Sequence, residues 1–309
     1  MEATFWQRLV RGVRSVPPSR ELEQSIGPDW ADRIMAMPVT DRLHVKQGRS
    51  IGRLVLESGR PSLVVYLKRH YRLPWRHGLL ALLRPGTGWS PAFQEWDHLR
   101  WAQSQGLPVP DVVGGGEFIG PWGRLQSFLA IKELTSMLPL HQAIPAAATQ
   151  LAPADFDRWK RGLAIEMARL AAELHRRHRF HKDFYLCHFY VAAEDTVRPV
   201  TWSGRVWLID LHRLGHHPWI WPWCLAKDLG QLWYSSEIHG VNGRDRAFFW
   251  HAYRKANPQA CTLSWLRPLI RLKAWTYRRH SRRGGRRSIP QPVATHTEPA
   301  AIAGAESVR

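Results

Sequence analysis

The sequence predicts an α+β fold of two lobes, in which a small β-rich lobe is followed by a larger helical lobe. Runs typical of strands cover residues 44–57 and 62–68, with turn glycines around them. Farther along, apolar residues recur every three or four positions over residues 155–178, which is the pattern of one buried helix face. With 309 residues and 44% hydrophobic residues, the chain can bury a core of this size.

Changes in composition divide the chain into four segments. Residues 1–40 mix basic, apolar and proline residues and are expected to form an N-terminal extension. Residues 41–134 are expected to form the small lobe, and residues 135–283 the large lobe. A hinge near Glu133 joins the two lobes. The polar tail over residues 284–309 is expected to be disordered, because it has too few apolar residues to pack.

Turn residues and helix-start signals predict the remaining elements. Ser90 followed by Pro91 is typical of a helix start, so a helix is expected from there through Trp101. An insert is expected before this helix, over residues 69–90. A turn-rich connection with three consecutive glycines is expected after it, over residues 106–117. Further strands are expected over residues 125–134 and 205–211, further helices over residues 228–234 and 245–257, and a Trp- and Pro-rich connection over residues 216–228.

The charge balance favours an anionic partner, because the formal net charge is +19. Nucleic acid, anionic lipid and a phosphorylated glycolipid all fit, although such a charge also serves solubility alone. The three cysteines are far apart and odd in number, which argues against a disulfide framework and fits a reducing cytoplasm. No apolar run approaches the roughly 18 residues of a membrane span, so the protein is expected to be soluble or peripheral.

Two aspartates in the second half have the pattern of a phosphoryl-transfer site. Asp183 follows the long helix, and Asp210 follows an apolar run that predicts a short buried strand. In this order, one carboxylate orients the acceptor hydroxyl and takes its proton, while the other holds Mg²⁺ on the phosphates of ATP. Each residue alone is also explained as a loop cap, so the prediction depends on the two occurring together.

A lysine and a glutamate upstream complete the pattern. Lys68 lies in a segment whose composition is typical of a β-strand. A lysine on such a strand can bind the α- and β-phosphates of a nucleotide. Glu95 lies in the helix expected from Ser90 and is the natural partner of Lys68. The order of these residues along the chain, with Asp183 and Asp210 following, is that of a kinase that uses ATP and Mg²⁺.

These residues resemble those of the lipopolysaccharide core kinases over roughly residues 40–275. The most specific match follows Asp183 and consists of Tyr185-x-x-His188-Phe189. Weaker matches are Val45-Lys46-Gln47-Gly48, Leu67-Lys68-Arg69-His70, Glu95-Trp96 and Lys227-Asp228-Leu229. The resemblance implies a protein-kinase-like fold and an ATP-dependent enzyme that phosphorylates a heptose or Kdo hydroxyl of the lipopolysaccharide inner core.

The kinase pattern and the resemblance together suggest a role for each candidate residue. Asp183 is expected to be the catalytic residue and Asp210 the metal ligand. The residues expected to bind the nucleotide are Lys68, Glu95, Gly48, Glu133 and His188. Gly48 is equally well explained as an ordinary turn glycine, because kinase phosphate loops usually contain more glycines than this segment does.

His188 stands where sugar and choline kinases of the same broad fold usually have an asparagine, as the resemblance predicts. Imidazole is a poor ligand for Mg²⁺, so His188 is expected either to bond a phosphate or to support Asp210. His181 is expected to brace the catalytic loop, and Asp228 to support it from below. A zinc site on the neighbouring histidines is the weaker alternative, since Cys or carboxylate ligands at standard spacing are missing.

Residues 267–287 interleave basic and aromatic side chains, as an interfacial amphipathic helix does. We therefore expect the protein to bind lipopolysaccharide core or another anionic glycolipid at the cytoplasmic face of the inner membrane. A solvated face and a single-stranded nucleic-acid patch are the alternatives, and no nucleic-acid-binding motif supports the latter. The expected contributors are Arg271, Lys273, Arg278, Arg279, Arg282 and Arg283, with Trp275 inserting at the interface.

Two other functions fit the same residues. One is a small-molecule or protein kinase of the same fold. The other is a catalytically dead kinase-like binding module, which turnover of ATP would exclude.

Overall fold

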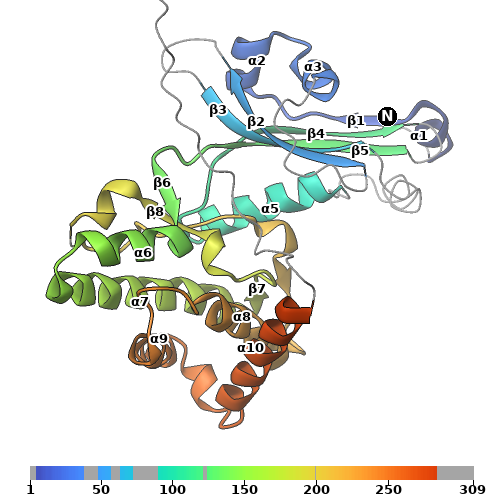
Figure 1. Cartoon of the computed structure of the whole chain (residues 1–309). Helices are drawn as coiled ribbons and strands as arrows, with labels where there is room; N and C mark the ends of the chain where they lie inside the picture. Colours follow the sequence, from blue (N-terminus) through green and yellow to red (C-terminus); the bar gives the residue numbers. More distant parts are fainter. Residues whose placement is uncertain are drawn as a thin grey trace, which may run out of the picture.

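The computed structural model describes residues 5–37, 48–56, 63–71, 90–120, 124–198 and 200–283, and within them it has two lobes (Figure 1). The small lobe contains α1 (Phe5–Arg11), β1 (Val13–Ser15), α2 (Arg20–Ile26), α3 (Trp30–Ala36), β2 (Arg49–Leu56), β3 (Leu63–His70), α5 (Pro91–Ser104), β4 (Val112–Gly120) and β5 (Arg124–Lys132). The large lobe contains β6 (Met137–Pro139), α6 (Leu140–Gln150), α7 (Pro153–His175), β7 (Arg179–Phe180), β8 (Phe189–Ala192), β9 (Trp207–Leu208), β10 (Gly215–His216), α8 (Trp221–Ser235), α9 (Gly243–Ala256) and α10 (Leu266–Arg283). Its short 3-10 helices are η2 (Leu186–His188), η3 (Ala193–Thr196), η4 (Leu211–Arg213) and η5 (Pro258–Cys261). The expected α+β architecture is confirmed.

The small lobe is built on a five-stranded antiparallel sheet in the order β1-β4-β5-β3-β2. Helices α2 and α3 cover one face of the sheet, and α5 lies against the other face (Figure 1). Leu22, Trp30 and Phe128 are buried between the sheet and the first pair of helices. The segment expected as an N-terminal extension thus adds an edge strand and part of the core to the small lobe.

Three consecutive glycines, Gly114 to Gly116, lie inside strand β4, so the turn-rich connection expected here is wrong. A Cβ atom at Gly114 would come within 2.5 Å of the Leu22 side chain of α2. A Cβ atom at Gly115 would come within 3.0 Å of the Trp96 ring of α5. The glycines therefore allow helices on both faces of the sheet to approach the strand closely.

Helix α7 runs through the large lobe and buries the apolar face that its sequence predicts. Trp159, Leu163 and Leu170 on that face are all buried, and α9 packs along the same helix. The helix ends at His175, slightly earlier than expected, and His178 beyond it has a left-handed backbone with φ of 52°. This turn directs the chain into the loop that carries Asp183.

Helix α8 begins at Trp221, whereas the sequence predicted a connection up to Asp228. Pro222 lies in the first turn of the helix, where the missing N–H has no helical partner to lose and the fixed φ favours the helix. The proline therefore marks a helix start rather than a loop. Helix α8 packs against α10 along much of its length.

The two lobes are joined by residues 133–136 between β5 and β6, and also by a contact of α5. His98 on α5 donates from Nδ1 to the backbone carbonyl of Leu211 in η4, at 2.8 Å. Since η4 directly follows Asp210, this bond fixes α5 against the segment that carries the expected metal ligand. The expected features that lie outside the described residues are the loop before Gly48, most of the insert over residues 69–90 and the tail from residue 284.

Candidate active site

Lys68, Glu95 and Asp210 meet where the small lobe faces the large lobe. Lys68 Nζ on β3 donates to Glu95 Oε1 at 2.6 Å and to Asp210 Oδ1 at 2.9 Å. Helix α5 places Glu95 here, since Ser90 caps its first turn by accepting from the backbone N–H of Phe93. The expected pair of Lys68 with Glu95 is therefore present, and Asp210 joins it.

Burial and charge together fix the ionisation of this cluster. Burial alone would lower the pKa of Lys68, but Asp210 and Glu95 raise that pKa well above its usual value. Burial opposes the ionisation of Asp210, yet Lys68, His212 and His188 hold its pKa well below its usual range. The cluster thus contains an ammonium and a carboxylate that stay charged at neutral pH, beside the buried Glu95.

Asp210 has a left-handed backbone, with φ of 63° and ψ of 52°. This conformation costs a residue with a Cβ atom roughly 1–2 kcal/mol. The strand expected over residues 205–211 ends earlier, at Leu208, because the chain turns at this point. The turn directs the Asp210 carboxylate toward Lys68, and His212 Nδ1 donates to the same oxygen at 2.9 Å.

Asp183 lies in the loop between β7 and η2, and its carboxylate is held by an arginine. Arg213 Nη1 donates to both carboxylate oxygens, at 3.0 and 3.1 Å. His188 donates from Nδ1 to the Asp183 carbonyl at 2.6 Å, and its Nε2 lies 3.8 Å from Asp210 Oδ2. His188 therefore lies between the two aspartates. The sequence interpretation did not include Arg213, whose direction depends on the η4 turn.

Helix α8 holds the backbone of this loop from below. Asp228 is fully buried and accepts from the backbone N–H groups of His181 and Lys182, both at 2.8 Å. Gln231 accepts from the N–H of Phe184 at 2.9 Å and donates to the Lys182 carbonyl at 3.1 Å. Burial, and after it His188, lowers the pKa of His181 to about 4, so the ring stays neutral beneath the loop.

The model of the lipopolysaccharide kinase (Kdo/WaaP) family matches residues 50–253, which is more than half of the chain. The chain belongs to this family.

Relatives and a solved structure agree with this assignment. The lipopolysaccharide core heptose(I) kinase WaaP of Pseudomonas aeruginosa is 29% identical over 209 residues, which cover 65% of this chain and 74% of the relative. The enzyme of the same name from Escherichia coli K12 is 29% identical over 195 residues, which cover 60% of this chain and 70% of the relative. The structure of WaaP in complex with acyl carrier protein matches with a TM-score of 0.61 and 24% identity, over 87% of this chain and 98% of that chain.

Membership in the lipopolysaccharide kinase family confirms the resemblance, the protein-kinase-like two-lobe fold and the phosphotransferase class that the sequence predicted. The matched residues begin within β2 and end within α9, so they include Lys68, Glu95, Asp183 and Asp210.

Two further residues expected at the nucleotide of this lipopolysaccharide kinase flank the small-lobe sheet. Gly48 precedes β2 with φ of 73°, and the next residue, Arg49, pairs with His70 at the end of β3 that carries Lys68. Glu133 follows β5, and its carboxylate accepts from Arg53 at 2.7 and 3.0 Å. The side chain of Glu133 is thus held within the small lobe.

Tyrosine rings border the Asp183 loop of the lipopolysaccharide kinase on the side of α10. The ring of Tyr185 lies 6.4 Å from that of Tyr277 on α10, which in turn lies 6.4 Å from that of Tyr234 on α8. Burial raises the pKa of Tyr185 to about 12, and its hydroxyl accepts from Gln231 Nε2 at 3.2 Å. Tyr277 was missed as a site residue because its neighbours come from distant parts of the chain.

Proposed function

We propose that the protein transfers the γ-phosphoryl group of ATP to a heptose or Kdo hydroxyl of the lipopolysaccharide inner core. The observation that carries this proposal is the contact of Lys68 with both Glu95 and Asp210, in a chain that belongs to the lipopolysaccharide kinase family. The named relatives, which are heptose(I) kinases, support the choice of a sugar acceptor.

In the proposed reaction, each residue acts from the position described above. Lys68 contacts the α- and β-phosphates of ATP, and Glu95 holds its ammonium in place. The acceptor hydroxyl gives its proton to the Asp183 carboxylate while its oxygen bonds to the γ-phosphorus. The bond from that phosphorus to the bridging oxygen breaks, and ADP leaves with the bridging oxygen. Arg213 must release Asp183 at least in part, because it now contacts both carboxylate oxygens.

The Asp210 carboxylate fits the expected magnesium ion. Mg²⁺ is usually held by one or two carboxylates, together with phosphate oxygens and water, so it does not need a complete cage of protein ligands. Within the described part of the chain, no group of three His, Cys, Asp or Glu side chains forms such a cage. Bound at Asp210, the ion would neutralise charge on the phosphates, and His188 would support the carboxylate rather than the metal.

Transfer of labelled phosphate from ATP to purified lipopolysaccharide core tests the proposed function. We expect one phosphate per acceptor, located on a sugar by mass spectrometry, with loss of the signal in Asp210→Asn. Labelling of proteins or small alcohols instead of the core would favour the alternative kinase function. No turnover of ATP with any acceptor would favour the dead binding module.

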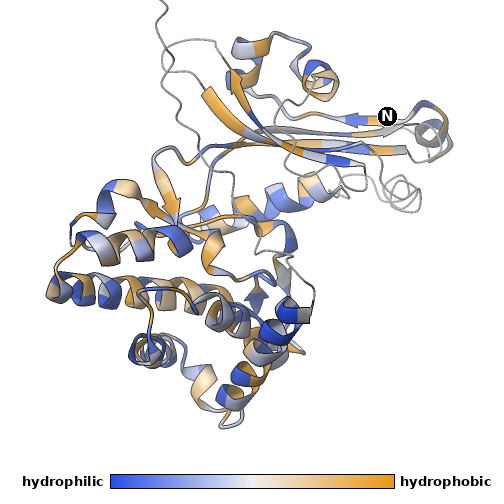
Figure 2. Ribbon diagram, in the orientation of Figure 1, coloured by the Kyte–Doolittle hydropathy of each residue, from blue (hydrophilic) through white to orange (hydrophobic). Residues whose placement is uncertain are grey.

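We infer that the protein also binds the anionic cytoplasmic face of the inner membrane. Trp219, two residues before α8, is 94% exposed, and Ile220, Trp223 and Trp275 are also exposed. Helix α10 carries both hydrophilic and hydrophobic residues along its length (Figure 2). Basic side chains beside exposed tryptophans suit an interface with anionic lipid. None of the described helices is long and apolar enough to cross a membrane.

The structure corrects which basic side chains of α10 are available. Lys273 Nζ lies 3.8 Å from the centre of the Trp223 ring, and Arg278 is paired with Glu237. These two were expected among the most exposed contributors and are only partly exposed. The side chain of Arg283 lies outside the described residues. Of the contributors expected from the sequence, Arg271, Arg279 and Arg282 are exposed.

Neutralising Arg271, Arg279 and Arg282 of α10 to glutamine, with the exposed Arg267 left in place, is expected to weaken binding to anionic vesicles. Each basic residue near such a surface contributes about 1 kcal/mol, so the loss of three should lower the affinity for anionic vesicles at low salt by roughly 100-fold. Co-sedimentation with anionic and neutral vesicles measures this effect. The matched control neutralises the exposed Arg158, Arg198 and Lys255 elsewhere on the large lobe. Equal losses in both variants, or equal binding to neutral vesicles, would contradict a membrane role for α10.

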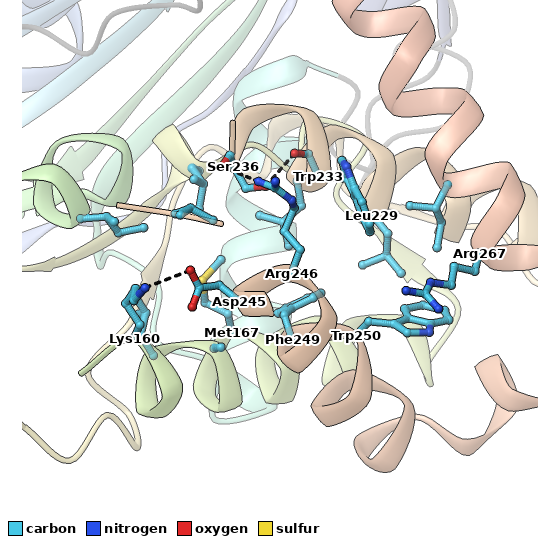
Figure 3. A pocket seen from close by; sticks show the side chains of 17 residues that line it. Lys160, Met167, Leu229, Trp233, Ser236, Asp245, Arg246, Phe249, Trp250 and Arg267 are labelled. Carbon is cyan, nitrogen blue, oxygen red and sulfur yellow. Dashed lines mark hydrogen bonds and ion pairs between the residues drawn. The ribbon is translucent and has the colours of Figure 1, made fainter. Parts of the chain in front are cut away.

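A cavity in the large lobe is the basis for proposing a second binding partner. It measures ≈ 780 Å³ with its opening to solvent and lies between α7, α8, α9 and α10 (Figure 3). Met167, Leu229, Phe249 and Ile270 give it a largely apolar lining. Because the solved relative is a complex with acyl carrier protein, we propose that this chain binds an acyl carrier protein whose acyl chain enters the cavity.

Acylated carrier protein is therefore expected to bind much more tightly than the unacylated form. Each buried methylene contributes about 0.8 kcal/mol, so two methylenes in the cavity already give a tenfold difference in Kd, to order of magnitude. Calorimetry with both forms measures this difference. Met167→Trp should reduce it by filling the cavity, whereas the volume-conserving Met167→Leu should leave it in place. Equal affinity for both carrier forms would exclude the cavity as the acyl site.

A further inference from the structure

Basic side chains gather beside the loop that carries Asp183. Lys182 Nζ lies 3.4 Å from His217 Nε2, and Arg213 contacts the Asp183 carboxylate. Lys227 lies on α8 directly before Asp228, which bonds the Lys182 backbone. Among the described residues, no carboxylate lies within ion-pair distance of Lys182 or Lys227. The only acidic group that Arg213 pairs with, within the same residues, is the proposed base itself.

The position of Lys182 is fixed by its backbone. Its φ of 65° lies in the left-handed region, which a residue with a Cβ atom keeps only when its surroundings enforce it. Asp228 and Gln231 enforce it by bonding its N–H and its carbonyl. The ammonium rests over Gly215, where a Cβ atom would come within 2.6 Å of Lys182 Nζ and 2.7 Å of His217 Nε2.

Among the charged groups that act on Lys182, Arg213 and Lys227 outweigh Asp228. Burial, followed by Arg213 and Lys227, lowers the pKa of Lys182. Burial, followed by Lys182, also lowers the pKa of His217. The nearby Asp228 carboxylate is already occupied by two backbone N–H groups. An anion bound among these side chains would relieve their mutual repulsion and accept charge-assisted hydrogen bonds.

We propose that Lys182, Arg213, His217 and Lys227 form a binding site for an acidic group, phosphate or carboxylate, of the sugar acceptor. The site adjoins Asp183, so an acceptor held by its acidic group would present a neighbouring hydroxyl to that carboxylate. Binding of the anion also draws Arg213 away from Asp183 and frees the base to take the proton. This inference rests on the proposed function, since it assumes a sugar acceptor.

The nucleotide is the other source of phosphate, and other residues are proposed to bind it. The residues proposed for the nucleotide are Lys68, Glu95 and Asp210, which bond to one another. The charged groups that act on Lys182 are Arg213, Lys227 and Asp228, which belong to η4 and α8. None of these groups is among the residues proposed to bind the nucleotide, so we assign the cluster to the acceptor.

Binding of inorganic phosphate tests the site without any need for turnover. The full chain is first saturated with a non-hydrolysable ATP analogue and Mg²⁺, so that the nucleotide site is occupied. Phosphate should then raise the melting temperature of the wild type and of the exposed control Lys255→Met, but not of Lys182→Met. A parallel titration with acetate distinguishes a phosphate site from a carboxylate site. The proposal would be overturned if each anion stabilised the wild type, Lys255→Met and Lys182→Met equally. It would also be overturned if neither phosphate nor acetate stabilised any of them.

Kinetics supply the second readout. In Lys182→Met the KM for the acceptor should rise about tenfold or more, the loss expected for one hydrogen bond to a charged group, while the KM for ATP stays unchanged. Gly215→Ala keeps every charge but displaces Lys182 and His217, so it should raise the acceptor KM in the same way. An unchanged acceptor KM in both variants would also overturn the proposal. If the wild type phosphorylates no lipopolysaccharide, the proposed function fails, while phosphate binding still decides whether the anion site exists.

Discussion

Asp183→Asn is expected to lower turnover by about 10²–10⁴-fold while leaving the Kd for ATP unchanged. The amide keeps the shape of the side chain but cannot take the proton of the acceptor hydroxyl. Nucleotide binding should survive, because Lys68, Glu95 and Asp210 bond to one another and not to Asp183. Single-turnover transfer of labelled phosphate and titration with a fluorescent ATP analogue measure the two quantities separately.

Asp157→Asn is the matched control for the catalytic substitution, since it makes the same chemical change at an exposed position on α7. It should keep the turnover of the wild type. The Arg213 contact adds a second check, because Asp183→Asn removes the carboxylate that Arg213 now holds. If Asp183→Asn retained nearly full activity on the purified core, Asp183 would not be the base, and the proton would have to leave by another group.

Strand and helix signals in the local sequence were sufficient to predict the elements that carry Lys68 and Glu95. Lys68 lies in a strand of β-rich composition, and Glu95 lies in a helix with a clear start at Ser90. The sequence pattern alone therefore placed both residues on regular elements within the small lobe. Their meeting with Asp210 follows from the order of elements in a two-lobe fold, and the structure has all three in contact.

The missed features depend on contacts between distant segments. Glycine is a turn signal in a local window, but Gly114 and Gly115 are needed because helices approach both faces of β4. Arg213 follows Asp210 closely in sequence, yet only the left-handed turn at Asp210 directs it to Asp183. The ring of Tyr277 lies beside that of Tyr185 in the Asp183 loop because α10 packs on α8, which no local pattern indicates.

Asp228→Ala is expected to have the largest effect on stability. Asp228 is fully buried and is the acceptor for the backbone N–H groups of His181 and Lys182. Each buried donor left without a partner costs about 1–3 kcal/mol, so the free energy of unfolding should fall by about 2–6 kcal/mol. Urea denaturation followed by tryptophan fluorescence measures this loss. The loop should also become more open to proteolysis, because no other side chain bonds these two N–H groups in the described structure.

Asp228→Asn keeps the shape of the side chain and changes only its hydrogen-bonding groups. Its amide oxygen can serve one N–H group, but its NH₂ group would oppose the other, so the loss should be smaller than in the alanine variant yet still measurable. Asp157→Ala, at an exposed position, should change stability by no more than about 0.5 kcal/mol. An Asp228→Ala protein as stable as this control would mean that water or a shifted α8 satisfies the loop. In that case the catalytic loop would owe its conformation to the strained residues His178, Lys182 and Asp210 themselves rather than to the helix beneath it.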